Sequence, residues 1–125
     1  MMTQRTYLQL PINADEGFPQ AFRLSFNGNT YQVTLYVNIL EDTLSDASTL
    51  YVLPQKGAFM VMRVAREDAT GTTVIFQRKL VLNHEYEAQE VAFLFKQMTV
   101  AQENLNGVGT FGSVVLGGIA TRWGS

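Results

Sequence analysis

The clearest alternation of apolar and polar residues lies between Ala21 and Asn38. Large apolar residues occupy every second position on both sides of Asn27-Gly28-Asn29, and these three residue types tolerate positive φ. A period of two places successive side chains on opposite faces of a strand, and a short turn of this composition joins two such strands. The stretch therefore predicts a β-hairpin with one buried face, which needs a second layer to cover it.

Shorter apolar or alternating runs follow along the chain. They predict further strands at residues 7–12, 50–53, 58–66, 73–82 and 91–95. Residues 83–89 fit either one or two helical turns or the end of a charged strand, and residues 96–106 predict a fading strand and a loop. We expect an all-β fold, a small β-sandwich or barrel of about seven strands with antiparallel hairpins and at most one short helix.

Three runs carry more specific expectations. Pro11 removes one backbone donor from the first strand, which favours an edge position. Residues 59–62 are apolar at every position, so their strand is central or covered by a partner. In the second hairpin, Val74 and Phe76 are expected to share one face with Leu80.

The C-terminal stretch differs in composition from the rest of the chain. Glycines at positions 107, 109 and 112 allow tight turns and close backbone approach, and the single tryptophan, Trp123, stands near the end. We interpret the chain as one β-rich domain over residues 1–125, with residues 107–125 as a Gly-rich C-terminal arm. Trp123 is expected to dock either on the domain itself or on a neighbouring subunit.

Charge and composition narrow the function. Only 16% of the residues are charged, below the usual quarter, which leaves a neutral surface and favours assembly. Nine basic and eleven acidic residues are scattered and give a net charge of −2, so we expect no nucleic-acid binding. The absence of cysteine excludes disulfides and thiolate ligands. No apolar run approaches the ~20 residues of a membrane span or resembles a signal peptide, so we expect synthesis in the cytoplasm without membrane insertion.

Candidate catalytic and metal-binding groups are few. His84 lies beside Glu85 and Glu87, but no nucleophile motif accompanies it, and we interpret it as an exposed turn histidine. The acidic segment 41–46 lacks the spacing of a calcium loop and is interpreted as a solvated loop. Residues 107–112 match Gly-x-Gly-x-x-Gly without a βαβ context, so a turn or bulge is expected. We expect no catalysis, cofactor or metal.

Met and aromatic residues are enriched at protein interfaces, although strands also bury such residues in their own core. For an assembling subunit, the candidate interface residues are Phe59, Met60, Met62, Phe111, Ile119, Arg122 and Trp123.

The order of several short motifs resembles one protein family. Leu10-Pro11-Ile12 precedes the hairpin at residues 22–38, Arg66-Glu67-Asp68-Ala69-Thr70-Gly71 follows a strand, and residues 112–123 close the chain with Leu-Gly-Gly-Ile-Ala-Thr-Arg-Trp. In this order and length the chain resembles the baseplate plug proteins of contractile-tailed bacteriophages. The resemblance implies a virion structural protein of the tail baseplate, near the tail axis between the tube and the hub or spike proteins. It implies a homo-oligomer that contacts these other tail proteins.

Two other functions stay open at this point. A ligand-binding β-sandwich of the carbohydrate-binding kind would use Tyr36, Tyr51 or Trp123 as exposed stacking platforms. A small hydrolase would depend on His84.

Overall fold

The predicted hairpin is the first half of a four-stranded sheet. It consists of β2 (Gln20–Phe26) and β3 (Asn29–Ile39), joined by Asn27 and Gly28 with φ of 51° and 86°. Positive φ at both positions is the geometry of a type I′ turn, which matches the twist of the flanking strands. β3 pairs next with β5 (Ala58–Asp68), and β5 pairs with β6 (Gly71–Lys79). We call this antiparallel sheet, in the order β2-β3-β5-β6, the hairpin sheet.

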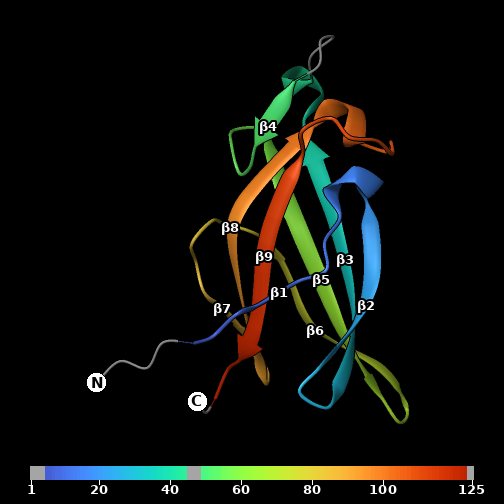
Figure 1. Ribbon diagram of the computed structural model, residues 1–125, viewed down its shortest axis with the longest axis vertical. Coiled ribbons are helices and arrows are strands. Elements are labelled where there is room, and N and C mark those ends of the chain that lie inside the picture. The colour runs from blue at the N-terminus through green and yellow to red at the C-terminus, as the bar shows by residue number, and fades with distance from the viewer. Residues whose placement is uncertain (1–4, 45–48, 124–125) are drawn as a thin grey trace.

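The second sheet contains the first and the last strand, and we call it the terminal sheet. Its order is β1 (Leu8–Gln9), β9 (Val114–Thr121), β8 (Val91–Ala101) and β4 (Leu50–Val52). A further strand, β7 (Tyr86–Ala88), pairs with the opposite end of β8 from β4, and Figure 1 shows the two on the same side of β8. The edge position of β1 agrees with the expectation from Pro11.

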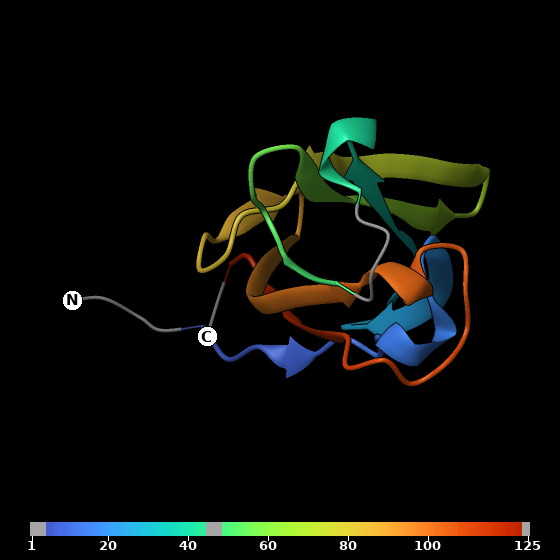
Figure 2. The same ribbon diagram turned by 90° about the horizontal axis from the view of Figure 1, so that it is seen from above.

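The computed structural model describes residues 5–44 and 49–123, and it shows the expected all-β class as a two-layer sandwich. Seen from above, the two sheets form opposite walls (Figure 2). Both sheets contribute to one core, whose largest fully buried side chains include Tyr31, Leu35, Met60, Met62, Phe93, Phe95 and Met98. The only helical elements of the described residues are three short 3₁₀ turns, at Ala14–Glu16, Glu41–Thr43 and Gln102–Asn104. No described helix has the length and apolar character needed to cross a membrane.

A β-bulge corrects the expected face of Val74. Phe76 pairs with Val64 and Val74 pairs with Ala65, so Ile75 is an extra residue in β6. The insertion sends Val74 and Phe76 to opposite faces. Phe76 is therefore buried, whereas 46% of Val74 is exposed on the outer face.

The structure also shows which secondary structure forms at residues 83–89 and where β8 ends. Within residues 83–89 the structure has the short strand β7 and no helix. The fading strand expected after residue 95 is a regular part of β8, which continues to Ala101 with a bulge between Phe95 and Gln97. The extra residue at the bulge keeps Phe95 and Met98 both inside, which a strict period of two from 95 does not predict.

The expected C-terminal arm is wrong for most of its length. Val114–Thr121 is β9, which lies between β8 and β1 inside the terminal sheet. Gly117 faces the core, where an added Cβ would lie 2.4 Å from the ring of Phe95. Glycine at this position thus allows close packing of β9 on β8, and the segment belongs to the fold.

A pair of alanine substitutions tests the assignment of core and surface. Met60 is fully buried, whereas 43% of Phe111 is exposed on a loop. We expect Met60→Ala to lower the free energy of unfolding by about 2–5 kcal/mol, because it leaves a cavity. Phe111→Ala should change it by less than about 1 kcal/mol. Urea unfolding followed by fluorescence measures both values, and equal losses would contradict the assignment.

Candidate assembly surfaces

The outer face of the terminal sheet carries exposed apolar side chains on β4 and β9, the two strands that flank β8. Val52 of β4 and Val114 of β9 both pair with Thr99 of β8, so the three residues form one row across the sheet. Leu50 lies two residues before Val52 and Leu116 two residues after Val114, so they flank this row on opposite sides and face the same way as it. The exposed fractions are 52% for Leu50, 57% for Val52, 38% for Val114 and 39% for Leu116. We call these four residues the apolar patch.

Charge is scarce around the apolar patch. Strands β4, β8 and β9 contain a single charged residue, Lys96, which is exposed and forms no ion pair with any residue in the described ranges. A hollow of about 250 Å³ beside Lys96 and Leu116 continues this surface toward Tyr7 and Leu94. Gly118 allows the N-terminal segment to pack closely on β9 here, since an added Cβ would lie 2.8 Å from Cβ of Tyr7. The face therefore combines the apolar patch with one unpaired cation and with the polar Gln97 and Thr99 of β8 between the halves of the patch, a mixture that suits a protein partner.

The opposite end of the same sheet is closed by a charged cluster. Arg5 pairs with Glu87 and lies 3.3 Å from Glu85, while Arg122 Nε lies 3.7 Å from Glu87 Oε1. The hydroxyl of Tyr7 donates a hydrogen bond to Glu85, and burial together with this bond raises the pKa of Tyr7 to about 12. These contacts fasten the N-terminal segment to β7 and to the end of β9.

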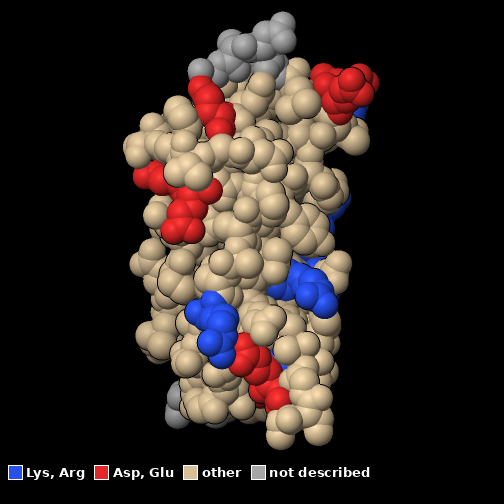
Figure 3. Space-filling view, turned by 90° about the vertical axis from the view of Figure 1, so that its right-hand side faces the viewer, with Lys and Arg blue, Asp and Glu red and all other residues tan. Residues whose placement is uncertain are grey.

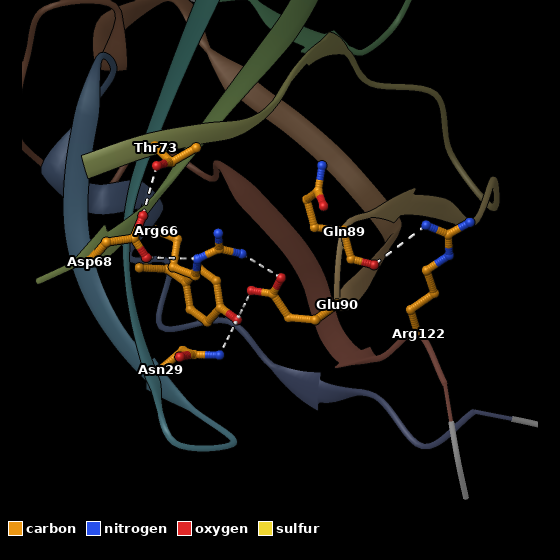
Figure 4. Close-up of polar contacts among 8 residues, drawn as sticks. Asn29, Arg66, Asp68, Thr73, Gln89, Glu90 and Arg122 are labelled. Atoms are coloured by element: carbon orange, nitrogen blue, oxygen red, sulfur yellow. Dashed lines mark hydrogen bonds and ion pairs between the residues drawn. The ribbon is translucent and has the colours of Figure 1, made fainter. Parts of the chain in front are cut away.

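A second polar cluster joins the two sheets. Glu90, in the turn between β7 and β8, accepts hydrogen bonds from Tyr31 Oη and Arg66 Nη1, both at 2.6 Å (Figure 4). Arg66 Nε also donates to Asp68 at 3.0 Å, and Thr73 donates to the same carboxylate at 2.7 Å. We call Tyr31, Arg66 and Glu90 the inter-sheet latch. Each carboxylate oxygen of Glu90 accepts one of these bonds, so the latch links the two sheets.

Burial and the bond to Glu90 raise the pKa of Tyr31 to about 12, with burial as the larger cause. The side chain is fully buried, so its hydroxyl keeps its proton across the neutral range.

The Gly-rich loop after the third 3₁₀ turn is held by polar contacts of its own. Asn104, fully buried, donates to the carbonyls of Gly107 at 3.2 Å and Gly109 at 3.0 Å, and accepts a bond from Ser113 at 2.6 Å. Thr110 and the backbone N–H of Gly109 donate to Asp15. The Gly-x-Gly-x-x-Gly match is thus a tethered loop followed by a strand, without the helix that a phosphate loop requires.

The seven candidate interface residues divide into three groups. Met60, Met62 and Ile119 are 0%, 0% and 1% exposed, so their prediction as interface residues is wrong: strand alternation directs them into the core. Phe59 is partly buried beneath Lys79, whose Nζ lies 4.3 Å from the ring centroid. Phe111 and Trp123 are exposed, with exposed fractions of 43% and 65%. Arg122 is partly exposed and stacks on Trp123, with its guanidinium carbon 5.0 Å from the ring centroid.

The residues proposed for the other two functions do not converge. Tyr51 is 3% exposed and its hydroxyl bonds to Gln102 at 2.6 Å, so it is not a stacking platform. Tyr36 is partly buried on the outer face of the hairpin sheet. His84 is exposed and its ring packs on Tyr86 at 4.5 Å. Over residues 5–44 and 49–123, no group of three His, Asp or Glu could hold a metal ion, and Asp46 of the acidic loop lies outside the described residues.

The apolar patch was not among the residues expected from the sequence. The available signal was that 50–52 and 114–116 are apolar at consecutive positions, and so leave apolar side chains on both faces of a strand. Comparison with protein-family models, with curated proteins and with solved structures finds no match for the chain.

The raised pKa of Tyr31 predicts alkaline destabilisation. An unfolded tyrosine titrates near 10, so between about pH 10 and 12 the unfolded state loses a proton that folded Tyr31 keeps. Stability is therefore fully present below pH 10 and falls as the pH rises toward 12. Tyr31→Phe should weaken this fall and cost about 1–3 kcal/mol at neutral pH, because Glu90 loses a donor.

Urea unfolding at a series of pH values checks this prediction, with tyrosinate absorbance to follow the titration. Tyr7→Phe is the comparison, since Tyr7 bonds outside the latch and its pKa is also raised to about 12. An alkaline fall of the same size in wild type and Tyr31→Phe would contradict the prediction.

Proposed function

We propose that this chain is a non-enzymatic structural subunit of a phage tail baseplate, where it packs near the tail axis between the tube and the hub or spike proteins. The observation that carries the proposal is the apolar patch on the outer face of the terminal sheet. Leu50, Val52, Val114 and Leu116 keep between 38% and 57% of their surface exposed, on strands with one charged residue. A partner that covers this face would remove apolar area from water.

The placement within a phage tail comes from the sequence. The order of the early Leu-Pro-Ile motif, the long hairpin, the Asp-x-x-Gly turn and the closing Leu-Gly-Gly-Ile-Ala-Thr-Arg-Trp segment resembles baseplate plug proteins. A structural subunit acts through its contacts with neighbouring proteins, which need a stable domain. The polar clusters described above contribute to that stability. The inter-sheet latch and the charged cluster at Arg5 use their carboxylates to hold the domain together.

The chemistry of the face also indicates the character of the surface that it would contact. Lys96 is the single charged residue of strands β4, β8 and β9 and lines the hollow beside Leu116. An apolar partner surface with a carboxylate opposite Lys96 would match both features. A carbohydrate-binding function gains no such support, because the described aromatic side chains do not form a row of exposed rings.

Native mass spectrometry over a range of concentrations tests the proposal, with Leu116→Glu as the decisive variant. A carboxylate in the apolar patch must give up its hydration when the contact forms, and pairing with the nearby Lys96 offsets only part of that cost, so we expect association to weaken by about tenfold or more. The expected result for the wild-type chain is a closed oligomer, or growth toward one as concentration rises.

Val74→Glu is the matched control. Val74 is 46% exposed on the outer face of the opposite sheet, and the same substitution there should leave association unchanged. Both variants should unfold within about 1 kcal/mol of the wild type. Equal association of Leu116→Glu and the wild type would contradict a role for the patch in self-assembly.

A further inference from the structure

Strand β2 leaves its outer backbone edge without a partner. In a two-residue hairpin, the two residues that flank the turn form a hydrogen-bonded pair, and here these are Phe26 and Asn29. From this pair onward, hydrogen-bonded and non-hydrogen-bonded pairs alternate along the two strands. The N–H and C=O groups of Ala21, Arg23 and Ser25 therefore point away from β3. No backbone group elsewhere in the described chain bonds to them, since β2 is the last strand of the hairpin sheet.

The other sheet edges are protected against pairing, in contrast to β2. The opposite edge of the hairpin sheet, β6, contains the bulge at Ile75 and ends in Arg78 and Lys79. The edge strands of the terminal sheet are only two or three residues long. Short strands, bulges and charges are the devices that prevent edge-to-edge association. β2 has none of them except one charge, and extends over seven residues without a bulge or proline.

The inner side of β2 is also incompletely covered. Its core-facing residues Phe22, Leu24 and Phe26 are only partly buried, although they pack on the core. The residues beside them on β3, Tyr31 and Val33, are fully buried. A strand added at the β2 edge would cover this apolar row if it carried apolar residues at alternate positions.

The outer side of β2 does not obstruct an added strand. Arg23 donates from Nε and Nη2 to the two carboxylate oxygens of Glu67, both at 2.8 Å, which directs its side chain across the sheet and neutralises its charge. The flanking residues Ala21 and Ser25 are small. Figure 3 looks at the side of the molecule on which Figure 1 places β2, and this surface is mostly uncharged.

We propose that two copies of the chain join edge to edge through β2, antiparallel and centred on Arg23, to form one continuous sheet. The second copy is the occupant that fits, because β2 itself supplies the alternating apolar row that its edge lacks. In this register Ala21 faces Ser25 of the second copy and Phe22 faces Leu24 of the second copy. The two central arginines stand opposite each other, each already paired with Glu67 of its own chain. The proposal deepens the assembly function proposed above and rests on it.

Ala21→Pro tests the β2 contact. Proline removes an N–H that the monomer does not use, and its ring fills the space where the second strand would bind. We expect the dimer dissociation constant, measured by sedimentation equilibrium, to rise by about a hundredfold or more. Gln77→Pro, on the β6 edge, is the control and should leave it unchanged. Circular dichroism and thermal melts establish that both variants fold.

Single cysteines test the register without relying on proline, because the chain has no cysteine of its own. Arg23→Cys places the two thiols opposite each other across the two-fold axis, within reach of a disulfide. With diamide as the oxidant, Arg23→Cys should give a covalent dimer. Ser25→Cys should not, because Ser25 faces Ala21 of the second copy.

The outcomes separate this inference from the proposed function. A dissociation constant unchanged by Ala21→Pro, or equal cross-linking of Arg23→Cys and Ser25→Cys, overturns the β2 contact even if Leu116→Glu weakens assembly. Loss of the dimer in Ala21→Pro but not in Leu116→Glu supports the β2 contact and contradicts the role of the apolar patch. A wild-type chain that stays monomeric at every concentration overturns the β2 dimer.

Discussion

The packing of two inner sheet faces against each other is the constraint on which the rest of the structure depends. Each long strand contributes alternate side chains to one core, in which Tyr31 and Met60 of one sheet and Phe93 and Phe95 of the other are fully buried. Neither sheet could bury its apolar face alone. The two bulges, in β6 and β8, adjust the alternation so that large side chains still meet the core where the strands bend.

Polar interactions follow from this packing. Tyr31 brings a hydroxyl into the region between the sheets, and a buried hydroxyl needs a partner. Glu90 provides it from the opposite sheet and also accepts a bond from Arg66, so the latch links the layers at one end. The buried side chain of Asn104 likewise has its hydrogen bonds satisfied, by groups of the Gly-rich loop and by Ser113. Among the described residues, no buried side-chain nitrogen or oxygen lacks a hydrogen-bond partner.

The surface has a different character. The terminal sheet presents an apolar outer face beside Lys96, and the hairpin sheet ends in an open edge at β2. These features are of two kinds, one a face and the other a row of backbone groups, and they lie on different sheets. A subunit that uses both could contact different neighbours at once, which is what the proposed place in a layered assembly requires.

The fold class and the central hairpin follow from local pattern, because strict alternation around Asn27-Gly28 specifies strand, turn and buried face. The edge position of the first strand follows in the same way from Pro11. The place of the C-terminal residues, in contrast, depends on long-range contacts. Their glycines allow a free arm and a tightly packed strand equally well, and the contact of Gly117 with Phe95 depends on a strand distant in sequence.

The candidate surfaces divide in the same way. Met60 and Ile119 were expected at an interface on residue type alone, yet residue type does not distinguish a core from an interface, since both are apolar. The apolar patch arises because β4 and β9 flank β8 in register, and the β2 edge is open because none of the other described strands pairs there. Both are consequences of long-range strand order, which local periodicity does not encode.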